Sequence, residues 1–191
     1  HLSALLQTSQ MTKFSKYVGR FAPSPTGDLH FGSLVTAVAS YLRARSLNGK
    51  WLLRIEDIDE KRNQKGSTYS ILKTLELHGL EWDDEVIYQS KRTEIYRFYL
   101  NHLIEKNLIY KCSCSRKNLI NYYKNLQTME YVYPGICRSK EIENKVFSCR
   151  IKALNTFNIN FTDNIQGSIE QNLEKEVGDF ILWRSENVAS Y

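Results

Sequence analysis

Residues 19–33, GRFAPSPTGDLHFGS, combine the residue types of an anion-binding site. The apolar residues at the start of this stretch favour a strand, whereas the two prolines and the glycine of 23–27 exclude a helix there. A helical periodicity begins near His30. A strand, a tight loop and a helix N-terminus in this order bring backbone N–H groups and the positive end of a helix dipole together, so the stretch predicts a phosphate site.

Two residues of the expected helix N-terminus fit this prediction. His30 lies in the first turn, where its ring can reach the same anion, and Gly32 lacks a side chain where a ligand ring could approach the backbone. A rigid structural turn is the alternative for the loop taken alone. Its expected place at the carboxyl end of a parallel strand, where α/β proteins bind ligands, favours the binding role.

Two opposite charges lie near the ends of the expected strands. Arg20 could hold a carboxylate through two parallel hydrogen bonds, and Glu56 could hold an ammonium group. Together they could bind both charged ends of an amino acid; a salt bridge between them is the alternative. Asp57 and Asp59 could contact a metal or a ribose, although solvated turn positions are their more ordinary role.

Three of the four cysteines form the pattern Cys112-x-Cys114 followed by Tyr133-Pro-Gly-Ile-Cys137. Three thiolates at this spacing can reach one tetrahedral ion, with Tyr133 or a water as the fourth ligand, which indicates structural zinc. Three unlinked cysteines or a disulfide are the alternatives, and a reducing compartment disfavours the disulfide. Cys149 belongs to an alternating apolar pattern, so we expect it in a core.

A stretch rich in tyrosine and basic residues could stack on bases and contact phosphates of RNA, although a polar surface with structural tyrosines is an equal alternative. Its members are Tyr122, Tyr123, Tyr131, Tyr133, Lys117, Lys124 and Arg138.

Strands and helices alternate in the first half of the chain, which predicts a βαβ unit with a parallel sheet. Their expected ranges are 16–22 and 50–56 for strands, and 30–47, 66–77 and 90–106 for helices. We expect Ser90 to cap the third helix and its residues 95, 98, 99, 103 and 104 to form one apolar face. A short helix opened by Ser115 and several short strands follow, and residues 177–182 are expected to return to the parallel sheet.

The bulk composition describes an ordinary globular protein. The chain has 191 residues, 42% hydrophobic residues and a formal net charge of +5, which is compatible with a polyanionic partner without requiring one. It contains no apolar run of membrane-spanning length, and residues 1–10 make a poor signal peptide, so we expect a cytoplasmic protein. We interpret Met11 as the natural start and residues 1–13 as a disordered extension.

The motifs GRFAPSPTG and LLRIEDID resemble those of the catalytic domain of class I glutamyl-tRNA synthetases, strongly over 17–62 and more weakly to 191. His30-Phe31-Gly32-Ser33 stands where that family has its HIGH signature, with Ser33 at the second histidine position. The cysteine pattern resembles the zinc site of one subgroup, the glutamyl-Q tRNA(Asp) synthetases, which lack an anticodon-binding domain. The separation of Cys114 from Tyr133 is longer than is usual there.

The resemblance implies a fold, a reaction and a set of residues. The fold is a Rossmann-type parallel sheet in 14–110 and 177–191, with an inserted zinc-containing, acceptor-binding-like α+β subdomain in 111–176. The reaction is activation of glutamate by ATP with Mg²⁺, then transfer to the queuosine base in the anticodon of tRNA(Asp). By resemblance, His30, Gly32 and Ser33 bind ATP; Arg20, Ala22, Ser24, Glu56 and Tyr191 bind glutamate; and Cys112, Cys114, Tyr133 and Cys137 bind structural zinc.

Two further functions stay open at this point: an N-terminal fragment of an ordinary glutamyl-tRNA synthetase, and a non-catalytic RNA-binding module. The family's second glutamate-binding arginine and its KMSKS-type loop are expected beyond residue 191, so we expect a truncated chain that is nearly inactive alone. We also expect a monomer with no membrane partner.

Overall fold

A computed structural model describes residues 17–125, 132–143, 145–153 and 158–190. The chain divides into two compact units, residues 1–92 and 93–191. The expected N-terminal extension lies outside the described residues, and the predicted domain boundaries stay a prediction. Among the described residues, no helix is long and apolar enough to cross a membrane.

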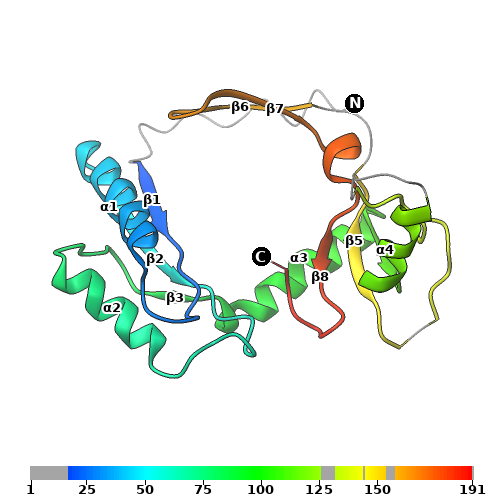
Figure 1. Ribbon diagram of the computed structural model, residues 1–191, viewed down its shortest axis with the longest axis horizontal. Helices are drawn as coiled ribbons and strands as arrows, with labels where there is room; N and C mark the ends of the chain where they lie inside the picture. The colour runs from blue at the N-terminus through cyan, green and yellow to red at the C-terminus, as the bar shows by residue number, and fades with distance from the viewer. Residues whose placement is uncertain (1–16, 126–131, 144, 154–157, 191) are drawn as a thin grey trace. The chain divides into compact units, whose positions relative to one another are not determined.

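The first unit is built on a parallel sheet of strand order β1-β2-β3 (Figure 1). The parallel pairing of β1 with β2 is as the sequence predicts, whereas β3 was not expected. Its strands are β1 Val18–Phe21, β2 Lys50–Ile55 and β3 Ile87–Tyr88, and its helices are α1 Phe31–Ser46 and α2 Ser67–Leu77. Helix α1 ends before Asn48 and Gly49, and α2 ends at Leu77, with His78 as its C-cap followed by Gly79, which has a positive φ. Both stop signals in the sequence therefore function as expected.

One face of this sheet carries the core of the unit. Alternate residues of β2, namely Trp51, Leu53 and Ile55, are fully buried among side chains of both helices, such as Ala37 and Ile71. Helix α1 approaches β1 closely because Gly19 lacks a side chain: a Cβ there would lie 3.3 Å from Ala44 Cβ. The opposite face carries Arg20, Lys50 and Arg54 beside the apolar Val18 and Leu52.

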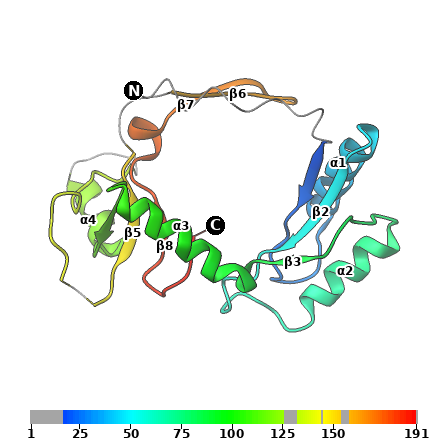
Figure 2. The ribbon, with the colours of Figure 1, turned by 180° about the vertical axis from the view of Figure 1, so that it is seen from behind.

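The second unit combines helices with antiparallel strands, a mixed α and β content like that expected for 111–176 (Figure 2). A three-stranded sheet has the order β4-β5-β8, and a separate hairpin joins β6 to β7. The elements are α3 Thr93–Glu105, β4 Ile109–Cys112, α4 Arg116–Asn125, β5 Ser148–Ile151, β6 Asn158–Asp163, β7 Gly167–Asn172, a single π-type turn Leu173–Val177 and β8 Ile181–Trp183.

Three expectations for this part of the chain are wrong. Strand β8 pairs antiparallel with β5 and does not join the parallel sheet. Ser90 lies in a 3₁₀ turn, Gln89–Arg92, so α3 begins at Thr93. The face of α3 that packs on Ile109, Cys149 and Trp183 consists of the half-buried Tyr96, Leu100 and Leu103. Four of the five predicted face residues are exposed: Ile95, Phe98, Tyr99 and Ile104.

Candidate functional site

The proline-rich loop, residues 23–27, follows β1. Hydrogen bonds connect it to Glu56, directly after β2, and to Ser67 at the start of α2. The Glu56 N–H donates to the Pro23 carbonyl at 2.9 Å, so the two strand ends lie side by side. The Gly27 N–H donates to Ser67 Oγ at 3.0 Å, and the Ser67 hydroxyl donates back to the Gly27 carbonyl. The prolines are buried and Ser24 is half-buried. The loop is therefore held in place by hydrogen bonds between backbones and one serine.

Helix α1 begins at this loop with His30 as its N-cap. His30 Nδ1 accepts from the Ser33 N–H at 3.2 Å, and Nε2 lies 3.1 Å from Ser33 Oγ. Gly32 adjoins the same ring, since a Cβ there would lie 3.2 Å from His30 Cε1. The structure thus brings together all three residues predicted to bind ATP, with His30 one residue before the helix. No acidic residue occupies the first turn, which leaves the positive helix end suited to an anion.

Arg20 and Glu56 share one face of the parallel sheet. Arg20 is in register with Leu52, and Glu56 follows Leu52 by four residues, so both stand on the face opposite the core. Glu56 forms its ion pair with Arg54 Nη2, a residue that sequence reasoning missed. Alternation along β2 could have identified Arg54, because residues two apart point to the same face.

Asp57 connects the loops that follow β2 and β3. Its carboxylate accepts hydrogen bonds from the Ser90 N–H at 2.8 Å and from the Ser90 hydroxyl at 2.7 Å. These hydrogen bonds favour a structural role for Asp57 at the carboxyl ends of the parallel strands over a role as a metal or ribose contact.

The predicted metal ligands of the second unit form one cluster, called here the thiol cluster: Cys112, Cys114, Cys137 and Tyr133. The three sulfur atoms lie within 4.8 Å of one another. Tyr133 Oη is 3.3 Å from Cys112 Sγ and 3.5 Å from Cys114 Sγ, and it accepts from the Cys137 N–H at 3.2 Å. The cysteines are free thiols, which rules out the disulfide alternative in this structure. Cys149 belongs to a separate core cluster, as expected.

The thiol cluster has the chemistry and the size of a tetrahedral zinc site. Sulfur ligands of one zinc ion lie about 3.8 Å apart, given a Zn–S distance near 2.3 Å. The Cys114 and Cys137 sulfurs are 3.5 Å apart. The residues present therefore fit zinc with Tyr133 as the fourth ligand, and all four positions filled by protein would make the ion structural.

Burial and hydrogen bonds change the acidity of the thiols in opposite ways. Burial raises the pKa of Cys114 to about 11. Burial also opposes ionisation of Cys137, but hydrogen bonds from the Tyr133 hydroxyl and the Ser113 backbone lower its pKa to about 7. The pKa of Tyr133 is raised, mainly by burial. Cys137 therefore ionises more readily than Cys114 near neutral pH.

A buried carboxylate lies close to the thiol cluster. Asp179 is fully buried and accepts from Arg138 Nε and Nη2, both at 2.7 Å, from the Tyr110 hydroxyl and from the Ala153 N–H at 2.8 Å. Burial alone would raise the pKa of this carboxyl, but the hydrogen bonds, that of Arg138 foremost, lower it below its ordinary value. Sequence reasoning missed Asp179, because nothing in its neighbourhood in the chain marks it.

Tyr133 owes its position to a glycine far along the chain. Tyr133 forms a parallel β-bridge with Gly178, and a Cβ on Gly178 would lie 2.9 Å from the backbone N and O of Tyr133. Gly178 also has a φ of +71°, which favours glycine. Tyr123 and Tyr133 are buried and Arg138 is held by Asp179, so these three do not form the predicted RNA-stacking surface. Tyr131 lies outside the described residues.

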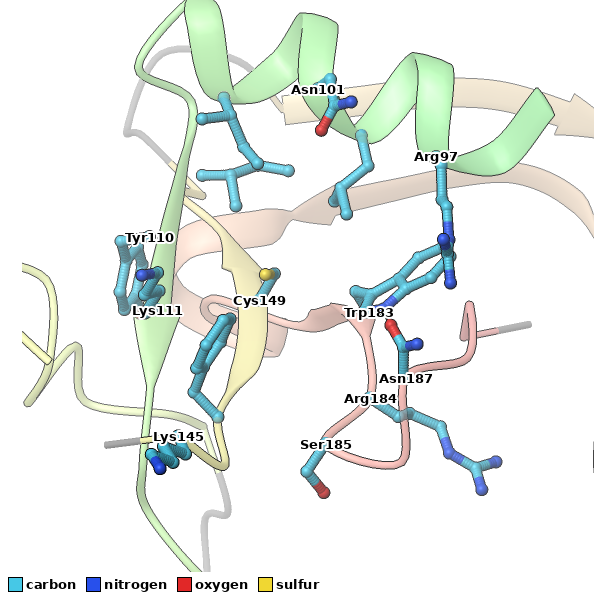
Figure 3. Close-up of a pocket in the computed structure, with 14 residues that line it drawn as sticks. Arg97, Asn101, Tyr110, Lys111, Lys145, Cys149, Trp183, Arg184, Ser185 and Asn187 are labelled. Carbon is cyan, nitrogen blue, oxygen red and sulfur yellow. Dashed lines mark hydrogen bonds between the residues drawn. The ribbon is translucent and has the colours of Figure 1, made fainter. Parts of the chain in front are cut away.

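A groove of about 700 Å³ lies between α3 and the β4-β5-β8 sheet (Figure 3). Its lining includes two aromatic side chains, each with a cation above it: Lys111 Nζ lies 4.6 Å from the Phe147 ring centroid, and the Arg97 guanidinium lies 5.7 Å from that of Trp183. Lys145 and Arg184 also line it, and none of the described lining residues is acidic. Cations beside flat apolar rings suit a base with its phosphate.

Comparisons with known proteins agree with the parallel-sheet unit and its motifs. Residues 16–191 match the family model "tRNA synthetases class I (E and Q), catalytic domain". Two relatives, both called glutamyl-Q tRNA(Asp) synthetase, are 45% identical: that of Pseudomonas entomophila over 93% of this chain and 57% of its own length, and that of Shewanella oneidensis over 96% and 59%. The chain thus spans little more than half the length of these relatives.

Solved structures of two glutamate-tRNA ligases have the same fold. The Elizabethkingia meningosepticum enzyme superimposes with a TM-score of 0.78 at 28% identity, over 93% of this chain and 40% of that one. The Elizabethkingia anophelis enzyme gives 0.79 at 28% identity, over 93% and 41%. With the family model covering nearly the whole chain, this protein belongs to the class I tRNA synthetases of the E and Q family, as part of their catalytic domain.

Proposed function

We propose that the protein activates glutamate with ATP and transfers it to the queuosine base of tRNA(Asp). One observation carries the activation step: the proline-rich loop, Glu56 and the His30-capped start of α1 lie at the carboxyl end of the same parallel strands. This is the edge of an α/β sheet where ligands bind. The names of the relatives supply the choice of glutamate and of tRNA(Asp).

The residues divide the work of positioning two substrates. His30, Gly32 and Ser33 would hold ATP, whose phosphates carry Mg²⁺, at the helix N-terminus. Arg20, Ala22, Ser24 and Glu56 would hold glutamate. Arg54 orients Glu56 by holding its Oε1, and we assign Oε2 to the substrate ammonium. Tyr191 is a further proposed glutamate contact, outside the described residues.

The reaction then needs no protein nucleophile. A glutamate α-carboxylate oxygen attacks the α-phosphorus of ATP in line, the bond to the bridging oxygen breaks, and pyrophosphate leaves with that electron pair. Catalysis would come from alignment of the two substrates and from neutralisation of phosphate charge. Zinc in the thiol cluster would contribute structure alone.

RNA binding has support from the second unit. The groove between α3 and the sheet offers aromatic rings with cations above them, and the whole chain carries a formal net charge of +5. Both features suit a polyanion with exposed bases. We propose this groove as a contact of the tRNA, in a protein of the reducing cytoplasm where the thiols stay available.

Ligand binding tests the activation step on the chain itself. Calorimetry should show binding of glutamate and of ATP. Glu56→Gln should weaken glutamate binding about tenfold or more and leave ATP binding unchanged. His30→Ala should weaken ATP binding and leave glutamate binding unchanged. Glu76→Gln, an exposed change on α2, is the control. Equal binding of aspartate, or variants that fail to separate the two ligands, would contradict the assignment.

A chimaera tests the transfer step. Residues 16–191 replace the matching part of the Pseudomonas entomophila relative, and glutamylation is measured on tRNA(Asp) with and without queuosine. We expect product on the queuosine-containing tRNA alone. Charging of the 3′ end of a tRNA would identify an ordinary glutamyl-tRNA synthetase, and tRNA binding with no glutamyl transfer would favour a non-catalytic module.

A further inference from the structure

Arg150 is a buried cation in contact with the thiol cluster. It lies in the middle of β5, and its side chain is on the opposite face of the sheet from Cys149, which packs in the core with Ile109 and Trp183. Only 7% of Arg150 is exposed. A buried guanidinium is costly unless nearby groups compensate for the lost water, so its surroundings should explain why it is there.

The guanidinium contacts two of the four residues of the thiol cluster. Arg150 Nε donates to Cys112 Sγ at 3.3 Å, and the guanidinium carbon lies 3.8 Å from the Tyr133 ring centroid. On its other side, Arg150 Nη1 donates to the backbone carbonyl of Asp179 at 2.6 Å. The carboxylate of Asp179 is engaged elsewhere, by Arg138, Tyr110 and the Ala153 N–H. The polar contacts of Arg150 are thus directed at a sulfur and a carbonyl.

We propose that Arg150 is a positioning residue for a divalent metal in the thiol cluster. Three thiolates carry one more negative charge than a dication neutralises, and a buried site bears that excess at a cost. The charge of Arg150 offsets the excess. Its fixed donor geometry also holds Cys112 Sγ, while its flat face lies against the ring of Tyr133. Groups that orient metal ligands in this way usually change metal affinity by 10- to 100-fold.

The alternative role is purely structural. Arg150 would then connect β5 to the segment around Asp179, and its removal would destabilise the fold equally with and without metal. Arg138 provides the matched control, because it is a second arginine of the same network and its hydrogen bonds go to the Asp179 carboxylate. The two arginines differ in that Arg150 alone of the pair donates to a sulfur.

Cobalt substitution separates the two roles. The wild-type chain and the variants Arg150→Gln, Arg150→Lys and Arg138→Gln are stripped of metal and titrated with Co²⁺ against a chelator of known affinity. The intensity and position of the thiolate-to-cobalt absorption band report the ligand geometry. Urea unfolding of each variant is measured with and without metal. The aminoacylation reaction is not used, so the outcome is independent of the proposed function.

We expect Arg150→Gln to bind Co²⁺ at least tenfold more weakly and to shift the absorption band, and Arg138→Gln to do neither. Arg150→Lys keeps the positive charge but lacks the planar donor arrangement of the guanidinium. It should therefore recover part of the Co²⁺ affinity, but its absorption band should still differ from that of the wild type. If Arg150→Gln does not fold, the Co²⁺ affinity and absorption band of Arg150→Lys are compared with those of Arg138→Gln, and this comparison also distinguishes the two roles. Equal metal affinity in these variants, equal destabilisation with and without metal, or no cobalt binding by the wild-type chain would overturn the proposal.

Discussion

Replacing the buried carboxylate of the second unit, Asp179→Asn, should cost the fold more than any change of an exposed acid. The carboxylate is fully buried and accepts four hydrogen bonds, two of them from Arg138. Asparagine keeps one acceptor oxygen but presents an N–H₂ group to a guanidinium and a hydroxyl that both donate. Breaking a buried pair costs about 3–5 kcal/mol. The Arg138 side chain is 34% exposed and can turn toward water, so we expect a loss of about 2–3 kcal/mol.

The acidity of Asp179 makes the prediction specific to pH. Its pKa lies below the ordinary value, so the stabilisation is fully present above the unfolded-state pKa of about 3.9 and is lost as the pH falls through the lower, folded-state pKa. The difference between wild type and Asp179→Asn should therefore be the same at pH 7 and pH 5. It should close only under more acidic conditions, where the wild-type carboxylate also becomes protonated.

Urea unfolding followed by circular dichroism gives the magnitude, and hydrogen exchange of peptides from β5 and β8 assigns the loss to this sheet. Glu141→Gln, an exposed acid of the same unit, should change stability by less than about 0.5 kcal/mol. A loss below about 1 kcal/mol for Asp179→Asn, or a difference already gone at pH 5, would refute the reasoning.

Two further changes test the cluster and the groove. Gly178→Ala should lower the free energy of unfolding by about 2 kcal/mol or more and reduce bound metal, because its Cβ would lie 2.9 Å from the backbone of the cluster's tyrosine. Gly167→Ala, also at positive φ but in open space, should cost about 1 kcal/mol and leave metal content unchanged; equal effects would contradict the argument. Lys111→Glu should weaken tRNA binding about tenfold at moderate salt, as measured by filter binding, whereas Lys124→Glu on α4 should not; matching losses would remove the groove from the RNA contact.

The first unit could be predicted from the sequence because its signals are local. Alternating apolar residues, Asn48-Gly49 and His78-Gly79 mark where strands and helices begin and end, and the observed elements agree with them. The apolar spacing of the third helix was less informative. Exposed Tyr99 lies four residues before Leu103 and shares its helical periodicity, and only the strands that pack against α3 determine which side is buried.

The site was predictable to the same extent. Cys112, Cys114, Tyr133 and Cys137 were recognisable from their types and spacing, and the structure brings them together. The groups that surround them lie far away in the sequence, in β5 and directly after the π-type turn Leu173–Val177. Arg150, Asp179 and Gly178 carry no local motif, so three-dimensional pairing alone identifies them.

The order of strands in the second sheet also bears on how the protein is made. Strands β1, β2 and β3 are complete by Tyr88, so the parallel sheet can close early during synthesis on the ribosome. The antiparallel sheet waits for β8, which ends at Trp183. Cys112 and Cys114 emerge well before the residues that enclose them. During that interval the nascent thiols are exposed to oxidants, so we expect reducing conditions during synthesis to raise the yield of correctly folded protein.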